Sequence, residues 1–131
     1  MSKFKIFLIL SLFVSITSCA QTDSNVQYLS ASEFKKAIDS GKYLLIDVRT
    51  PGEFSQGYIS GAINIDLYDN SFTAKMKTIT AKNKAIAFYC RSGNRSKVAI
   101  SGLDTKKIQI IDLNDGIISW QRAGYKLSTA K

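Results

Sequence analysis

The sequence of 131 residues contains no histidine, one proline and two cysteines. Without histidine, the chain cannot form a Cys–His or Ser–His–Asp catalytic arrangement, and it lacks a ligand of the usual zinc sites. Any nucleophile must therefore be activated by backbone dipoles and fixed cations, and we expect no metal and no cofactor. The apolar content of 45% and charged content of 21% are ordinary for one soluble globular domain.

The net charge of +8 comes from lysines that are scattered along the chain and are not interleaved with aromatic residues. Such scattered lysines are typical of solvated faces and not of a nucleic-acid-binding surface. We therefore expect no nucleic-acid partner. A small anionic substrate would also suit this balance of charge.

The N-terminus has the layout of a secretory signal peptide, because Lys3 and Lys5 precede an apolar run over residues 6–16. The run is too short for a membrane-spanning helix, which needs about 20 residues. The following "ITSC" resembles a bacterial lipobox. The resemblance implies cleavage before Cys19 and lipidation of that residue. The alternative is an ordinary secreted protein in which Cys19 is incidental.

These features divide the chain into a lipoprotein signal peptide at 1–18, a lipidated tether at 19–27 and a domain at 28–127. Lipidation of Cys19 would leave Cys90 as the free thiol and make an intramolecular disulfide impossible. We expect an extracytoplasmic protein, held on the periplasmic side by its lipid. Ala20 after the cysteine, in place of an acidic residue, favours the outer membrane in cells that have two.

Short apolar runs alternate with helix-like segments through the rest of the chain. Ser30 and Glu33 have capping-box spacing, and Pro51 suits the first turn of a short helix. Strands are expected at 43–48, 62–65, 85–90 and 108–113, with helices within 30–41, 50–57, 72–82, 96–103 and 116–124. Because no hairpin signal is present, the pattern predicts an α/β domain with a parallel sheet and helices on both faces.

The stretch "CRSGNRS" (90–96) follows a predicted buried strand, and ligands bind at the carboxyl ends of such strands. We expect the next helix to begin near Arg95 and Ser96, so that the loop amides and the helix N-terminus surround the sulfur. Both favour an anion, which would make Cys90 a reactive thiolate at neutral pH without a base. Gly93 permits a positive φ, and three side chains can cap or donate: Ser92, Asn94 and Ser96. The alternative is a buried, inert cysteine that packs as a small hydrophobic residue.

Three ordered segments, "LLIDVRTPGEFSQGYISGAINI", "FYCRSGNRS" and "LNDGIISWQRAGYKL", resemble those of single-domain rhodaneses, which are sulfurtransferases. The resemblance covers residues 28–127. It implies a three-layer domain with a mainly parallel five-stranded sheet. It also implies that Cys90 takes sulfane sulfur from thiosulfate or a similar anionic donor, as a persulfide. An external thiol, on a small molecule or a protein, or cyanide would then accept the sulfur.

The resemblance also assigns roles within the loop. The amides from Arg91 to Ser96 would bind the persulfide, Arg91 would guide the donor, and Arg95 would brace the loop or add charge. Related phosphatases and arsenate reductases place five residues between the cysteine and the arginine, whereas four separate Cys90 from Arg95 here. This count favours a pocket for sulfur. A noncatalytic binding or persulfide-sensing module is the other alternative.

Several conspicuous residues have a structural interpretation. We expect Asp47 to cap the next turn and Arg49 to pair with a nearby acid, for which Glu53 is a candidate. Trp120 has the spacing of a core residue on the last helix. The sequence departs from the family pattern at Tyr58, where a histidine is common, and at Asp115, which replaces the first glycine of a pair and could reshape a turn near the pocket.

Overall fold

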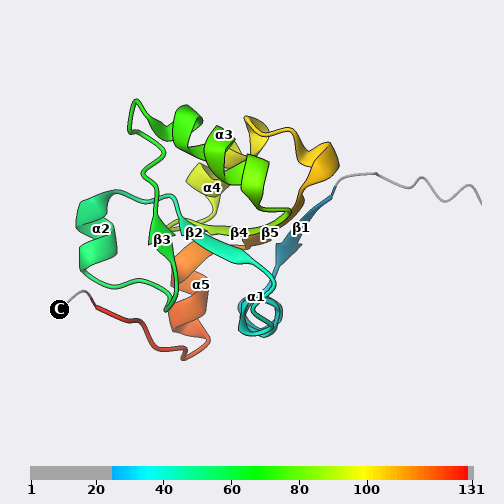
Figure 1. The fold of residues 1–131 in the computed structure, drawn as a ribbon. Helices are drawn as coiled ribbons and strands as arrows, with labels where there is room; N and C mark the ends of the chain where they lie inside the picture. Colours follow the sequence, from blue (N-terminus) through cyan, green and yellow to red (C-terminus); the bar gives the residue numbers. More distant parts are fainter. Residues whose placement is uncertain (1–24, 130–131) are drawn as a thin grey trace, which may run out of the picture.

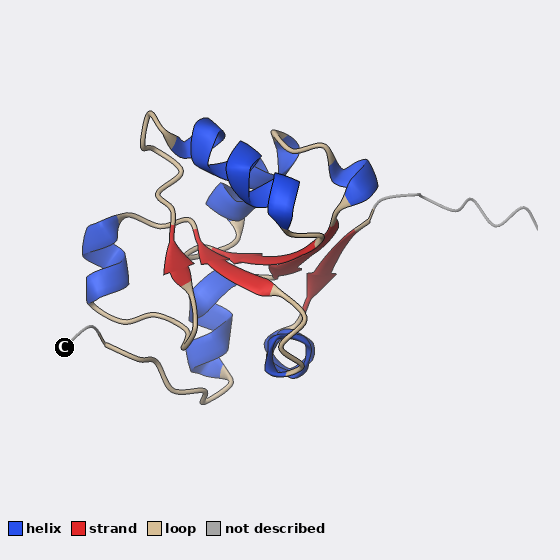
Figure 2. Ribbon diagram, in the orientation of Figure 1, coloured by secondary structure: helices blue, strands red, loops and turns tan. Residues whose placement is uncertain are grey.

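The computed structural model describes residues 25–129, in which helices cover both faces of a parallel sheet (Figure 1 and Figure 2). The strand order is β1-β5-β4-β2-β3, and every pairing between strands is parallel. The strands are β1 (Val26–Leu29), β2 (Leu44–Asp47), β3 (Ile63–Asn64), β4 (Ala85–Tyr89) and β5 (Gln109–Leu113). The predicted α/β class, with helices on both faces, is confirmed.

The helices occur where the sequence predicts them, with shifts of a few residues at their ends. They are α1 (Ala31–Asp39), α2 (Pro51–Ser55), α3 (Phe72–Lys82), α4 (Asn94–Ser101) and α5 (Gly116–Arg122), with a 3₁₀ turn at Thr105–Lys107. The Ser30–Glu33 capping box is present, and Pro51 occupies the first turn of α2. A second capping box joins Thr50 and Glu53 at the start of α2.

Strand β1 is the element that the residue pattern missed. It contains only four residues, of which Gln27 and Tyr28 are exposed, and so it lacks the apolar run of the inner strands. Val26 and Gln27 were assigned to the tether, but they pair with β5 at the edge of the sheet. The signal peptide at 1–18, Cys19 and the tether up to residue 24 lie outside the described residues.

Two apolar layers fill the space between the sheet and the helices. Side chains of α1 and α5, including Phe34 and Trp120, pack on one face of the sheet. Side chains of α3 and α4, including Met76 and Ile100, pack on the other face together with Cys90. The expected core position of Trp120 is therefore confirmed. Cys90 and the start of α4 lie on this second face, at the carboxyl end of β4.

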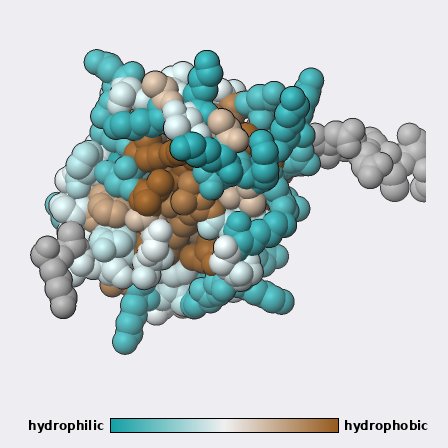
Figure 3. Space-filling model, in the orientation of Figure 1, coloured by the Kyte–Doolittle hydropathy of each residue, from teal (hydrophilic) through white to brown (hydrophobic). Residues whose placement is uncertain are grey.

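The face shown in Figure 3 is hydrophilic around its rim, and apolar side chains gather near its middle, over β2 and β3. Strand β3 is an edge strand, and Ile63 within it is exposed. None of the helices between residues 25 and 129 has the length and apolar character that crossing a membrane requires.

Candidate active site

Cys90 lies immediately after β4, and the loop that follows it turns into α4 within three residues. Gly93 is the N-cap of α4 with φ of 96°, a conformation that glycine adopts without strain. This turn directs the amide of Gly93 at the sulfur, where its N–H donates to Sγ over 3.0 Å. The helix begins at Asn94, one residue before the expected start. The sulfur is therefore held at a helix N-terminus, where backbone dipoles favour an anion.

The cysteine is almost completely buried, with 1% of its surface exposed. Its Sγ lies 3.6 Å from the hydroxyl of Ser96, which is fully buried and donates in turn to the Gly93 carbonyl over 3.2 Å. Arg91, Ser92 and Asn94 are exposed around the loop. The structure thus brings the predicted loop residues together, while the catalytic role of Cys90 stays a prediction.

The first turn of α5 supports the loop through backbone hydrogen bonds. The amides of Ile117 and Ile118 donate to the carbonyls of Cys90 and Arg91 over 2.9 and 3.3 Å. The turn that aims these amides uses two consecutive residues with positive φ, Asp115 at 60° and Gly116 at 61°. Asp115 therefore adopts the left-handed conformation that a glycine would take, and aspartate tolerates it better than most residues.

Arg95 and Glu53 form an ion pair across the site. Both guanidinium NH groups donate to the carboxylate over 2.7 Å, one to each oxygen. The hydrogen bond from Arg95, with support from Thr50, lowers the pKa of Glu53 to about 2, although partial burial opposes the shift. The pair joins α2 to α4, while the role of Arg95 in bracing the loop stays a prediction.

Asp47 and Arg49 form a second, buried ion pair. Arg49 donates from Nε to both oxygens of Asp47 and from NH2 over 2.6 Å, and NH2 also donates to the Gly57 carbonyl over 2.8 Å. Asp47 also accepts from the Arg49 amide, as expected of a residue that caps the turn. The suggestion that Glu53 pairs with Arg49 is wrong. Glu53 projects from the first turn of α2 toward α4, and Asp47 already occupies the guanidinium of Arg49.

A cavity of about 280 Å³ opens beside the loop. Its walls include Arg49, Arg91 and Glu53, together with Ile117, Ile118 and Gln121 from α5. Arg91 brings a positive charge to this space, whereas the Arg49 guanidinium is already paired with Asp47 and Glu53 adds a carboxylate. The cavity adjoins the loop at Arg91, although Cys90 does not itself line it.

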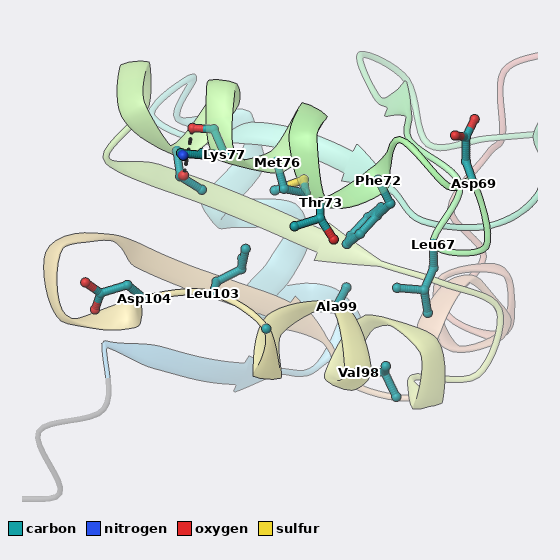
Figure 4. Close-up of a pocket in the computed structure, with 12 residues that line it drawn as sticks. Leu67, Asp69, Phe72, Thr73, Met76, Lys77, Val98, Ala99, Leu103 and Asp104 are labelled. Atoms are coloured by element: carbon teal, nitrogen blue, oxygen red, sulfur yellow. Dashed lines mark hydrogen bonds between the residues drawn. The ribbon is translucent and has the colours of Figure 1, made fainter.

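A larger groove of about 540 Å³ lies elsewhere, between α3 and α4 (Figure 4). Phe72, Met76, Ala99 and Leu103 project into it, whereas no residue of the loop 90–96 lines it. The smaller cavity is the better candidate for a substrate site because Arg91 of the sulfur-bearing loop lines it and brings a positive charge to it.

Asp112 is the residue near the site that the sequence analysis missed. It lies in β5, is fully buried, and neither of its carboxylate oxygens accepts a hydrogen bond from the described part of the chain. Burial raises its pKa to about 7, even though the nearby Ser96 hydroxyl and the charge of Lys97 lower it. The available signal was an acid within the apolar run "IQIIDL".

Tyr58, the other departure from the family pattern, has a packing role. Its ring stacks on Phe54 at 4.2 Å between centroids, and its backbone pairs with Ser128. Neither contact involves a residue of the loop 90–96.

Comparison with known proteins places this geometry in a family. The model of the rhodanese-like domain matches residues 30–123. A sulfurtransferase of Allochromatium vinosum is 34% identical over 96 residues, covering 72% of this chain and 87% of that protein. The chain belongs to the rhodanese-like family, and the class of activity that the matches support is that of a sulfurtransferase.

Solved structures agree with this placement. A rhodanese-related protein of Thermoplasma volcanium superimposes with a TM-score of 0.68 at 31% identity, covering 79% of this chain and 99% of that one. A thiosulfate sulfurtransferase of Pseudomonas aeruginosa gives a TM-score of 0.67 at 20% identity, covering 81% of this chain and 21% of that one. The second match shows the shared fold alone.

Proposed function

We propose that this protein transfers sulfane sulfur from thiosulfate, or a similar anionic donor, to an external thiol or cyanide through a persulfide on Cys90. The observation that carries the proposal is the setting of the sulfur: the Gly93 amide donates to Sγ over 3.0 Å at the N-terminus of α4. This setting stabilises negative charge on sulfur without a histidine.

The reaction proceeds in two displacements. The Cys90 thiolate attacks the outer sulfur of thiosulfate, a new S–S bond forms, and the S–S bond of the donor breaks as sulfite leaves with the electron pair. The acceptor then attacks the terminal sulfur of the persulfide, and Cys90 departs as a thiolate. Cys90 is the only free cysteine between residues 25 and 129, so the acceptor must come from outside this part of the chain.

The two arginines of the loop have separate tasks in this mechanism. Arg91 is exposed and lines the cavity beside the loop, where its charge would attract a dianionic donor. Arg95 is held by Glu53 through two short hydrogen bonds and fixes the loop in shape. The spacing of the loop opposes a phosphatase, because only four residues separate Cys90 from Arg95.

The burial of Cys90, at 1% exposed, favours the alternative of a noncatalytic binding or persulfide-sensing module, because it shields the sulfur from small molecules in solution. Incubation of the purified protein with thiosulfate, followed by mass spectrometry, distinguishes the two. We expect a gain of one sulfur on Cys90 and its loss on addition of cyanide or a small thiol. No gain of sulfur with any sulfane donor would favour the binding module.

The variant Cys90→Ser, which preserves size, is the matched control for sulfur transfer. We expect no gain of sulfur and no thiosulfate-dependent turnover, with an unchanged circular dichroism spectrum. Full activity in this variant would refute the mechanism.

We also propose that the protein is anchored outside the cytoplasm by a lipid on Cys19. The support is the order of charged residues, apolar run and "ITSC" in the sequence. The variant Cys19→Ala should move the protein from the membrane fraction to the soluble fraction. Continued membrane association of this variant would contradict the anchor.

A further inference from the structure

Four lysines lie at the edge of the sheet opposite the candidate active site. Because the strands are parallel, they all begin at one edge of the sheet and end at the other, where Cys90 follows β4. Figure 1 shows the amino end of β1 at the right of the sheet and α2, which follows the carboxyl end of β2, at the left. The segments that precede β2, β4 and β5 bring exposed lysines to the edge where the strands begin: Lys42, Lys84, Lys106 and Lys107. We call the surface that these four lysines form the amino-edge surface.

Contacts between neighbouring segments make the amino-edge surface continuous. Lys84, Lys106 and Lys107 line one cavity of about 380 Å³. Lys42 adjoins them through Gln109, which lines the same cavity and accepts from the Lys42 Nζ over 2.6 Å. The topology of the sheet thus gathers lysines that are scattered along the sequence.

The positive charge of this surface is largely uncompensated. None of its four lysines forms an ion pair with a carboxylate between residues 25 and 129. Within the described part of the chain two acids flank the surface, Asp39 at the end of α1 and Asp104 at the 3₁₀ turn. Asp39 is paired with Lys35, and Asp104 accepts from the Lys106 amide over 3.2 Å. The surface therefore keeps a net positive charge.

The described chain begins at the same surface. Asn25 lines the cavity with the lysines, and its side-chain amide donates to the carbonyls of Thr105 and Lys106 over 3.1 and 3.0 Å. Asn25 is six residues beyond Cys19, and a chain of this length spans at most roughly 20 Å. A lipid on Cys19 would therefore hold the amino-edge surface close to the membrane.

We propose that the amino-edge surface rests on the anionic headgroups of the membrane that holds the lipid on Cys19, so that the active-site loop faces away from that membrane. Each lysine is attracted to an anionic lipid surface within about a Debye length, which is about 8 Å at physiological salt. The tether favours the edge from which the chain emerges, because the opposite edge lies a full strand length further away. This assignment rests on the proposed lipid anchor and not on the chemistry of the sulfur.

This orientation suits an anionic sulfur donor. Thiosulfate is a dianion, and an anionic membrane repels it over about a Debye length. Strand β4 has five residues, and at about 3.3 Å per residue it places Cys90 about 16 Å beyond the amino edge. The loop then lies about two Debye lengths from the headgroups, where the donor is no longer depleted. A domain that lay with its loop on the membrane would meet fewer donor anions.

The attraction should be electrostatic, without insertion into the membrane. The exposed large apolar side chains of the described residues are Tyr28, Ile63, Tyr68 and Val98, and none of them lines the cavity between the lysines. Binding through charge alone is screened by salt, whereas insertion of apolar groups is not. We therefore expect high salt to abolish the contact.

The first test measures, by sedimentation, how the lipid-free mature chain binds to vesicles. This chain contains residues 19–131 and carries Cys19→Ala. We expect binding at low salt to vesicles of equal parts phosphatidylglycerol and phosphatidylcholine, and no binding to phosphatidylcholine alone. Each lysine near an anionic surface contributes about fivefold in affinity. The triple variant Lys84→Gln, Lys106→Gln, Lys107→Gln should therefore bind about 100-fold more weakly.

The matched control removes the same charge from three exposed lysines on other parts of the surface, with Lys36→Gln, Lys77→Gln and Lys126→Gln. Its affinity for the anionic vesicles should fall by less than about fivefold, the contribution of one lysine. All six side chains are exposed, so both variants should fold, which urea unfolding would verify. Equal weakening in the two variants would show attraction by net charge alone and would overturn the proposal.

The second test measures the orientation of the lipidated protein on anionic vesicles whose headgroups carry a quencher. A fluorophore is attached at Gln27→Cys, beside the lysines, or at Asn70→Cys, in the loop after β3, both in a Cys90→Ser background. Both positions are exposed, and neither change alters the charge. We expect strong quenching at position 27 and weak quenching at position 70. Equal quenching at the two positions would overturn the orientation.

The anchor and the amino-edge surface fail separately in these experiments. Retention of Cys19→Ala in the membrane fraction after a high-salt wash would overturn the anchor, since salt releases a contact made by charge alone. The surface would then be judged by vesicle binding of the lipid-free chain. An absence of that binding would overturn the surface, whereas the lipid anchor and the sulfur loading of Cys90 would be unaffected.

Discussion

Because α5 supports the loop, we expect Gly116→Ala to lower the stability of the protein severely. A Cβ atom at this position would lie 2.6 Å from the Cys90 carbonyl oxygen and 2.5 Å from the Arg91 carbonyl carbon. Both atoms belong to backbone that cannot rotate away. Relief of the clash must move either the loop or the first turn of α5.

The expected loss of stability in Gly116→Ala has two parts. Gly116 has φ of 61°, and an L-residue in the left-handed region costs roughly 1–2 kcal/mol. Overpacking against fixed neighbours adds about 1–3 kcal/mol. The sum of about 2–5 kcal/mol is a large share of the stability of a small domain.

Gly124→Ala is the matched control, because Gly124 also has a positive φ, of 83°, but a Cβ there would meet no atom within 4 Å. It should cost only the backbone part, roughly 1–2 kcal/mol, and keep full sulfur loading. The assay is urea unfolding with mass spectrometry of Cys90 after thiosulfate. Equal stability losses and equal loading in the two variants would refute the reasoning that α5 fixes the loop.

Three further changes test the charges and turns around the site. Glu53→Gln should cost about 1 kcal/mol and slow loading, since it weakens the brace on Arg95 at a partly exposed position. Because the Glu53 pKa is lowered to about 2, its stabilisation should be present above pH 4.5 and fade as the pH falls toward 2, which acid titration of unfolding would show. Asp115→Gly should raise the unfolding free energy by about 0.5–1 kcal/mol in urea, since it relieves the left-handed aspartate; a loss would contradict this. Because the Asp112 pKa is raised from 3.8 to about 7, the fold loses stability as pH rises through that range, so Asp112→Asn should gain up to about 4 kcal/mol at pH 8 and little at pH 4.

The features that the sequence predicted best are those that depend on residues close together in the chain. The Ser30–Glu33 box forms across one helical turn, and the inner strands show continuous apolar runs because both faces are covered. Strand β1 was not predicted, because an edge strand of four residues needs no continuous apolar run. The loop from Cys90 to Ser96 was located by its position after a predicted strand and by its residue types, and the family resemblance then assigned roles within it. The backbone of the loop explains why the arrangement favours an anion.

Residue patterns could not predict the contacts between segments that lie far apart in the sequence. Glu53 was paired with Arg49, four residues away, but its partner Arg95 lies 42 residues along the chain. That partner depends on the angle at which α2 approaches α4. The burial of Asp112 likewise depends on α4 lying over β5, which the run "IQIIDL" does not encode by itself.

The amides that α5 extends to the loop also limit how the loop can change in length. A residue inserted between Cys90 and Arg91 would carry one of their carbonyls away from the amides of Ile117 and Ile118. Such an insertion would leave polar backbone groups unpaired unless the turn at Asp115 and Gly116 changed with it. The length of the loop and the shape of this turn are therefore coupled, although the two segments lie far apart in the sequence.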